Sequence, residues 1–207
     1  KVKKTALSDF ANVRRGGIIA IKILPSDNLI EARFTSGQND VVLITSNGQS
    51  IRFNEEDVRT MGRSAAGVRG IRLGKEDHVI ALAIANPDAT LLVAGENGVG
   101  KRTDFDEYRV QSRGGKGIIT MKTTKKTGKV VGALTVHDHN EIMIITVGGQ
   151  MVRTTVKGIR QTGRNAQGVR IVRLDENDRL QDIAPVITAG REDEVEKSEE
   201  GDEEEID

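Results

Sequence analysis

Basic side chains recur at regular intervals along this chain, and their chemistry is that of phosphate binding. The first set follows a predicted glycine turn and consists of Lys4, Arg52, Arg102 and Arg153. The second set lies 18 or 20 residues further along and consists of Lys22, Arg72, Lys122 and Arg173. The third set lies in a glycine-rich loop and consists of Arg63, Arg113 and Arg164. Ammonium and guanidinium groups neutralise DNA phosphates and release their counterions, so the three sets are candidates for contact with a DNA backbone.

The apolar neighbours of these cations predict the direction in which the cations point. Ile51 and Phe53 flank Arg52, and the neighbours of Arg72 and Arg173 are apolar as well. Successive side chains of a strand point to opposite faces, so burial of the neighbours directs the cations outward. Repeated around a disc, they form a continuous basic belt on the rim. The alternative is that exposed Lys and Arg protect strand edges from pairing with other chains.

The composition limits the kind of nucleic acid that such a belt would bind. Aromatic residues make up 2% of the chain and there is no Trp, which argues against a base-stacking platform for single strands. No stretch has the sustained period of a recognition helix for the major groove. Glycine-rich loops bring backbone N–H groups close to phosphates. The sequence therefore predicts duplex DNA that is bent and held by its backbone.

Three further motifs suggest catalytic or ligand chemistry but are interpreted otherwise. The segment 95–102 resembles a nucleotide-binding loop, yet Arg102 replaces the Ser or Thr that would hold magnesium, and a hairpin is expected there. His137 and His139 have no further ligand cluster near them in sequence, which favours a solvated turn over a metal site. Tyr108 is the only tyrosine and is expected to pack in the core. We therefore predict no catalytic residue, no metal and no cofactor.

An internal repeat of about fifty residues positions the basic sets. Its first half is an apolar run, a tight glycine turn and a second strand, found at 41–53, 91–103 and 142–154. The turn glycines, which must accept positive φ, are Gly48, Gly98 and Gly149. Its second half is a glycine-rich loop followed by two more strands, such as 78–84. About four strands per repeat is the size of a propeller blade.

The repeat divides the chain into a partial unit at 1–36, three complete units at 37–86, 87–136 and 137–187, and a tail at 188–207. Residues 4–10 match the strand that follows the turn, and residues 18–23 match the strand at 68–73. The chain thus opens inside a unit, and we expect it to be a fragment. Helical structure is expected only as single turns, such as 54–58.

Charge is unevenly distributed along the chain. Residues 191–207 contain 11 acidic and 2 basic side chains, whereas residues 1–190 contain 20 acidic and 29 basic ones. We expect the acidic tail to be disordered, and to act either as a solubility segment or as an intramolecular competitor for the basic surface. The chain has no Cys and therefore no disulfide or thiolate metal site. No apolar stretch approaches the roughly 20 residues that span a bilayer.

The repeat sequences resemble the C-terminal β-pinwheel domain of the DNA gyrase A protein. Residues 62–73, 3–10 and 163–169 carry the resemblance, which extends over residues 1–187. It implies an all-β fold: a propeller-like disc of four-stranded antiparallel blades that exchange strands, with about three and a half blades in this chain. It also implies a non-catalytic domain that wraps duplex DNA around a basic rim, so that the whole enzyme introduces negative supercoils with ATP.

The family's box sequence, Gln-Arg-Arg-Gly-Gly-Lys-Gly, has a diverged counterpart in this chain. It consists of Gln111, Ser112, Arg113, Gly114, Gly115, Lys116 and Gly117, with Ser112 in place of an Arg. We expect the true box to lie upstream of this chain. The predicted DNA-binding residues are therefore the three basic sets together with Lys116.

The resemblance implies partners and a setting as well. Partners would be duplex DNA, the gyrase A N-terminal region and the gyrase B protein, in a bacterial cytoplasm and away from membranes. ATP and magnesium would act in other domains of the parent topoisomerase. Two alternatives are the equivalent domain of the topoisomerase IV A protein and a propeller that binds other proteins. The acidic tail and the close repeat match favour gyrase.

Overall fold

The computed structural model describes residues 1–187, and the predicted acidic tail lies outside the described residues. In the described part the regular structure consists of β-strands and short 3₁₀ helices. The strands are β1 (Asp40–Thr45), β2 (Gln49–Asn54), β3 (Val79–Ile84), β4 (Thr90–Gly95), β5 (Val99–Asp104), β6 (Ile118–Ile119), β7 (Val130–Val136), β8 (Glu141–Thr146), β9 (Met151–Thr155), β10 (Val169–Arg170) and β11 (Leu180–Pro185). The 3₁₀ helices are η1 (Leu7–Phe10), η2 (Glu55–Asp57), η3 (Phe105–Glu107) and η4 (Val156–Gly158). The all-β prediction is confirmed, and none of the described helices is long and apolar enough to cross a membrane.

Each predicted glycine turn closes an antiparallel hairpin, which pairs β1 with β2, β4 with β5 and β8 with β9. Gly48, Gly98 and Gly149 have φ values of 75°, 73° and 86°. L-residues rarely adopt this left-handed conformation, whereas glycine enters it freely. The Asn-Gly and Gly-Gly pairs therefore fix the position of each hairpin.

Neighbouring repeats exchange their shortest strand. The strand orders are β3-β1-β2-β6, β10-β5-β4-β7 and β11-β8-β9, with antiparallel pairing throughout. β6 comes from the repeat that contributes β4, β5 and β7, yet it completes the sheet of β1 to β3. β10 likewise leaves the repeat of β8, β9 and β11 to pair with β5. Each exchanged strand therefore ties one sheet to the next repeat.

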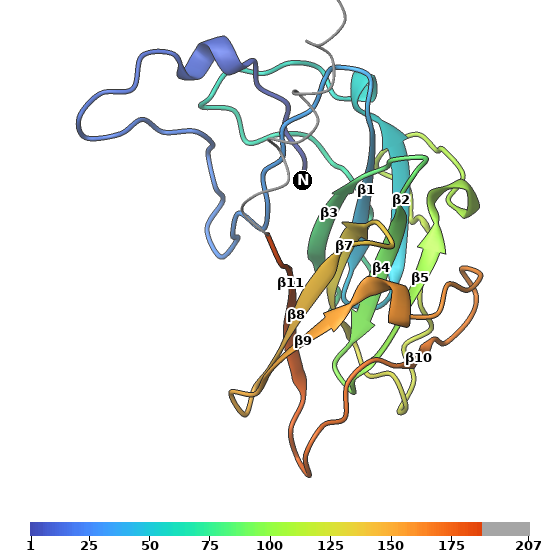
Figure 1. The fold of residues 1–207 in the computed structure, drawn as a ribbon. Coiled ribbons are helices and arrows are strands. Elements are labelled where there is room, and N and C mark those ends of the chain that lie inside the picture. Colours follow the sequence, from blue (N-terminus) through green and yellow to red (C-terminus); the bar gives the residue numbers. More distant parts are fainter. Residues whose placement is uncertain (188–207) are drawn as a thin grey trace, which may run out of the picture.

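The central strands are apolar without interruption because both of their faces are buried. Along β4, Leu91 and Val93 pack toward the sheet of β1, and Leu92 and Ala94 pack toward the sheet of β8. Each of these four side chains is 0% exposed. Continuous apolar runs are typical of strands buried on both sides. The sheets are therefore stacked in sequence order, with a hydrophobic core between each pair (Figure 1).

The two edges of each sheet have different surroundings. β3 packs against β7, and β7 packs against β11. These three strands therefore lie together on one side of the stack. The exchanged strands β6 and β10 lie at the opposite edge of their sheets, together with the glycine-rich loops that precede them. The loop edge is thus the outer perimeter of the described repeats.

The partial unit forms no sheet of its own. Figure 1 shows residues 1–36 (blue) as a meander beside the strands. At 68–73 only an isolated bridge at Val68 forms, and the strand expected at 18–23 is absent, so both strand predictions are wrong. A strand needs a hydrogen-bonding neighbour, and the hairpin that would pair with residues 18–23 is missing from the described residues. Apolar side chains in the unit are accordingly exposed, including Phe34 at 84% and Ile19 at 73%.

Candidate nucleic-acid interface

The glycine-rich loops dock on the preceding repeat with the same register each time. Val68, Ile118 and Val169 directly follow the three loops. They pair with Val2, Ser50 and Gly100 respectively, which are equivalent positions in the repeat. The loops are therefore placed at the same edge of successive units, as a periodic rim requires.

Close backbone contact explains why each loop ends in glycine. Gly67, Gly117 and Gly168 have φ values of 81°, 76° and 90°. A Cβ atom on them would lie 2.5, 2.2 and 2.5 Å from a carbonyl oxygen of the preceding repeat. No side chain fits at such distances, so these glycines are required both for the φ angle and for the docking of the loop.

The second basic set has the exposure that was predicted for it. Its members Lys22, Arg72, Lys122 and Arg173 are all exposed. The Arg72 amide donates to the carbonyl oxygen of Gly115 at 2.7 Å, which joins this segment to the glycine-rich loop of the next repeat. Arg72 and the exposed Lys116 line one open depression of about 550 Å³. Two cations from successive repeats therefore face the same surface hollow.

The first basic set is largely structural, and the prediction that Arg52 and Arg102 point freely into solvent is wrong. The guanidinium of Arg52 donates from Nε to Asp40 Oδ2 at 2.8 Å and from Nη1 to the carbonyl oxygen of Phe105 at 2.7 Å. Arg102 is only 5% exposed and donates from Nε to the carbonyl oxygen of Ile159 at 2.8 Å. Its Nη1 forms an ion pair with Asp138.

The other two members of this set occupy the ends of the described repeats. Lys4 Nζ donates to the carbonyl oxygen of Glu55 at 2.9 Å, so it also reaches the 3₁₀ helix of the next unit. Arg153 pairs with Glu141 and keeps 53% of its side chain exposed. Alternation correctly places these cations off their own core face. It cannot show that the next repeat covers that face at Lys4, Arg52 and Arg102 and offers carbonyl oxygens to them.

The third basic set is half-buried and also bridges repeats. Arg63 donates to the carbonyl oxygen of Ile19 at 3.3 Å, and Arg113 donates to that of Arg69 at 3.0 Å. Arg164 makes the equivalent bond to Ile119. The acceptors are at matching positions of the preceding unit. These guanidinium groups therefore anchor the loops while leaving part of their surface at the perimeter.

A fourth basic set was missed by sequence reasoning. It consists of Arg59, Arg109 and Arg160, all exposed and spaced 50 and 51 residues apart. Each immediately precedes a residue that bridges to the neighbouring repeat, namely Thr60, Val110 and Gln161. The partial unit has Ala11 at this position. The regular spacing was the signal that could have found the set.

The loop at 111–117, which resembles the family box, is held by the preceding repeat. The Gln111 amide donates to the carbonyl oxygen of Arg52 at 2.8 Å, and the Gly114 amide to that of Gly70 at 2.6 Å. Lys116 projects from the loop and is exposed, while Arg113 is anchored as described above. The loop therefore offers a single free cation rather than a cluster.

The remaining sequence motifs have structural surroundings. Residues 95–102 form the turn and second strand of the β4–β5 hairpin, and Lys101 is 0% exposed. Tyr108 is buried, and its hydroxyl shares a 2.7 Å hydrogen bond with Thr120 Oγ1. His137 and His139 stack with ring centroids 5.4 Å apart in the turn between β7 and β8. In residues 1–187, no three His, Asp or Glu side chains are grouped so as to hold a metal ion.

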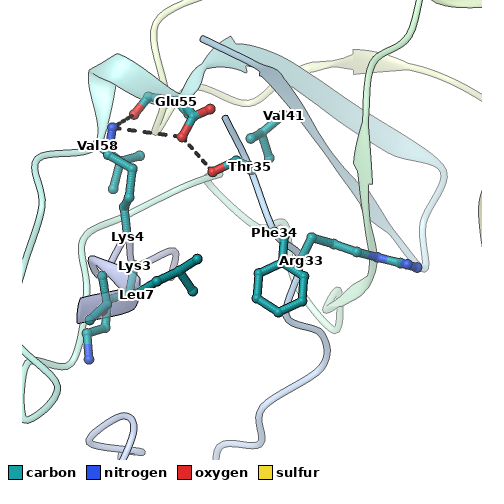
Figure 2. Close-up of a pocket in the computed structure, with 10 residues that line it drawn as sticks. Lys3, Lys4, Leu7, Arg33, Phe34, Thr35, Val41, Glu55 and Val58 are labelled. Atoms are coloured by element: carbon teal, nitrogen blue, oxygen red, sulfur yellow. Dashed lines mark hydrogen bonds and ion pairs between the residues drawn. The ribbon is translucent and has the colours of Figure 1, made fainter. Parts of the chain in front are cut away.

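A cavity of about 150 Å³ lies between the partial unit and β1, where Glu55 and Lys4 meet (Figure 2). The Glu55 carboxylate accepts hydrogen bonds from Thr35 Oγ1 at 2.7 Å, Gly37 N at 2.9 Å and Asn39 N at 2.8 Å. Burial disfavours the charged form of Glu55, but these bonds and the Lys4 ammonium outweigh that cost and lower its pKa. Because the carboxylate is fully occupied, we assign this cavity to the packing of the partial unit.

Comparison with known proteins places these features in a family. The model of the DNA gyrase C-terminal domain, β-propeller, matches residues 1–36, 39–86, 89–137 and 140–187. The DNA gyrase A protein of Mycolicibacterium smegmatis is 46% identical over 185 residues, which cover 88% of this chain and 22% of that protein. The chain thus spans about a fifth of the length of the curated relatives that it matches.

Two solved structures share the fold. The C-terminal domain of DNA topoisomerase IV superposes with a TM-score of 0.83 at 25% identity, covering 89% of this chain and 58% of that one. The DNA gyrase A C-terminal domain superposes with a TM-score of 0.76 at 29% identity, covering 84% of this chain and 59% of that one.

Proposed function

The chain belongs to the DNA gyrase C-terminal domain, β-propeller family, and on that premise we propose that it binds duplex DNA by its backbone and wraps it along the loop edge. The observation that supports this proposal most strongly is the recurrence of exposed cations at one edge of successive repeats. They are Lys22, Arg72, Lys122 and Arg173 of the second set, and Arg59, Arg109 and Arg160 of the fourth. Half-buried Arg113 and exposed Lys116 add positive charge in the loops between them.

The arrangement of the repeats supports bending rather than straight binding. Each loop docks on the previous repeat in one register, so successive cations are displaced by the same step. The strands β3, β7 and β11 pack in succession on the other side of the stack. A duplex that contacted every loop in turn would follow a curved path. Bending DNA costs a few kcal/mol, which additional phosphate contacts offset.

In the whole protein this domain would serve an ATP-dependent type II topoisomerase. We propose that wrapping fixes the sense of a DNA crossing that the enzyme converts into negative supercoils. The active site, ATP and magnesium would belong to the gyrase A N-terminal region and the gyrase B protein, in the bacterial cytoplasm. This chain would contribute DNA binding without catalysis.

Binding to the DNA backbone predicts that the affinity falls steeply with salt concentration. A protein that contacts 6–10 phosphates loses roughly a thousandfold or more of its affinity between 50 and 200 mM salt, irrespective of sequence. Binding of the full chain to two unrelated duplexes should therefore show the same steep salt dependence. An affinity that is absent, or that barely changes with salt, would instead favour a propeller that binds other proteins.

The equivalent domain of the topoisomerase IV A protein is a second candidate because the solved topoisomerase IV domain superposes well. The sequence identity to the DNA gyrase A protein is higher, at 46%. Joined to its parent enzyme, a gyrase domain should support negative supercoiling of relaxed plasmid with ATP. A topoisomerase IV domain should support relaxation only.

A further inference from the structure

Two of the glycine-rich loops each lie over a lysine of the preceding repeat. Lys101 donates from Nζ to the carbonyl oxygen of Gly163 at 3.0 Å and also to that of Arg164. Lys3 donates from Nζ to the carbonyl oxygens of Arg63 at 2.5 Å and Ala20 at 2.8 Å. Both lysines occupy the same position of the repeat. A Cβ on the loop glycine, Gly168 or Gly67, would lie 3.3 Å from the lysine Cβ in both units.

Stability alone does not explain a lysine at this position. Lys101 is 0% exposed and has no carboxylate within ion-pair distance among the described residues. The repeat at 37–86 has Ile51 at the equivalent position, also 0% exposed, and there an apolar side chain packs in the core. A buried ammonium is costly unless its hydrogen bonds are specific. The loop carbonyl oxygens are the groups that Lys101 is placed to bind.

The bonds of Lys101 determine which backbone groups the loop turns inward. The carbonyl oxygen of Gly163 also accepts the Ala166 amide at 3.0 Å, which closes the turn of the loop. Lys101 thus holds the same carbonyl from below, together with that of Arg164. Carbonyl oxygens carry partial negative charge and would repel a phosphate if they faced outward. Because both oxygens point toward the Lys101 ammonium, they do not face a phosphate that approaches the loop from outside.

We propose that Lys101, and Lys3 at the equivalent position, are positioning residues that hold loop carbonyl oxygens away from the DNA, so that the loops present a phosphate-binding surface. This inference rests on the proposed function, because it assigns the loops a DNA backbone as ligand. It adds that the affinity depends on two lysines that never touch the DNA. The loop at 111–117, which lies over Ile51, does not use this support.

The charge of Lys101 gives the inference a pH signature. Burial lowers its pKa from 10.5 to about 8, while Glu107 raises it and Arg164 lowers it further. Burial also lowers the pKa of Lys3, with Asp9 opposing the shift and Arg63 adding to it. Above pH 8 the Lys101 ammonium loses its proton and with it the charge that strengthens its bonds to the carbonyl oxygens. The support of the loop should therefore weaken between about pH 7 and 9.

The test replaces Lys101 by Met in the full chain, with Ile51→Met as the matched control. Hydrogen exchange of the Ala166 amide reports on the loop, and the Kd for a random-sequence duplex reports on binding. Loss of a charge-assisted bond should raise the exchange rate of Ala166 by about tenfold and weaken DNA binding by about tenfold in Lys101→Met. Ile51→Met should change neither. The ratio of exchange rates between variant and parent should fall toward one as the pH rises from about 7 to 9.

The outcomes separate this inference from the function on which it rests. If the parent chain fails to bind duplex DNA, the proposed function is contradicted. If the exchange of Ala166 is unchanged in Lys101→Met, the positioning role is contradicted even when the chain binds DNA. Faster exchange with an unchanged Kd contradicts it equally. Should Lys101→Met not fold, Lys3→Met provides the same test, with the Ala65 amide, which donates to the carbonyl oxygen of Gly62 at 3.1 Å, as its probe.

Discussion

The guanidinium of Arg102 crosses a repeat boundary and donates to the carbonyl oxygen of Ile159, 2.8 Å from its Nε. One repeat earlier, Arg52 donates to the carbonyl oxygens of Phe105 at 2.7 Å and Tyr108 at 3.3 Å, and Tyr108 is the position equivalent to Ile159. Lys4 donates to the carbonyl oxygen of Glu55, the position equivalent to Phe105. The carbonyl oxygens of Glu55 and Phe105 already accept an amide of their own 3₁₀ turn, from Val58 and Tyr108 respectively, at 3.0 Å each. The cation from the preceding repeat adds a second, charged donor to them. Lys4, Arg52 and Arg102 of the first basic set therefore join repeats, and their removal should affect folding before it affects DNA binding.

Replacing Arg102 by Gln should destabilise the chain by about 2 kcal/mol, because a buried carbonyl oxygen loses its charged donor. Asp138 would lose its partner but is exposed enough to be hydrated. The matched control is Arg153→Gln, at the same position of the last repeat, where the ion pair with Glu141 is exposed and contributes about 0–1 kcal/mol. Urea unfolding of both variants measures the difference. Equal losses would show that Arg102 has no bridging role.

The free energy of unfolding should depend on pH through the protonation of Glu55. Its folded pKa is lowered, so its contribution is fully present above the unfolded value near 4.3 and is lost as the pH falls through the folded pKa. Glu55→Gln should therefore be less stable than the parent at pH 7. The gap between the two should narrow as the pH falls below about 4. Thermal unfolding across this range measures the gap, and a constant gap would contradict the assigned hydrogen bonds.

Two glycines with positive φ allow the energetic cost of the left-handed conformation to be measured apart from the cost of a close contact. Gly117 has a φ of 76°, and an added Cβ would lie 2.2 Å from the carbonyl oxygen of Ser50. Gly149 has a φ of 86° with open space around it. Gly149→Ala should cost about 1 kcal/mol from the left-handed conformation alone. Gly117→Ala should cost at least about 2 kcal/mol more and displace β6 from β2. Chemical denaturation measures the loss of stability in each variant. Similar losses in the two variants would mean that the loop at 111–117 shifts to accept the added methyl group at little cost.

The architecture could be predicted largely from local sequence. Continuous apolar runs such as Val41 to Ile44 predict strands buried on both faces, and Gly48 predicts the turn that follows. The contacts of the Arg52 side chain could not be predicted in this way. Alternation shows the face of the strand on which a side chain lies, but not the element that covers that face. The family resemblance implies an exchange of strands, but the sequence does not show that β6 is the exchanged strand, since two residues are too few to show a period. The expected strand at 18–23 failed because strand formation depends on a partner.

The candidate site was predicted in part. The exposure of Arg72 and Arg173 was predicted from their apolar neighbours, and both side chains are exposed. The reason given for Arg72 holds only in part, because Leu73 is 42% exposed and the segment around Arg72 forms no strand. The distinction between these free cations and the bridging Arg52 and Arg102 required the neighbouring repeat in place. The set of Arg59, Arg109 and Arg160 was not predicted, although its spacing is as regular as that of the third basic set. What sequence periodicity supplies is the set of equivalent positions, and packing decides which of them remain free.

The most direct test of the wrapping account compares two pairs of exposed arginines on opposite edges of the stack. Arg72→Gln with Arg173→Gln removes charge from the loop edge. Arg33→Gln with Arg179→Gln removes the same charge beside β3 and β11. Affinity of the full chain for a random-sequence duplex, measured as a function of salt, should fall by about tenfold or more for the first pair. Its salt slope should decrease by about 2. The second pair should leave both nearly unchanged, and equal losses from the two pairs would contradict the claim that DNA follows the loop edge.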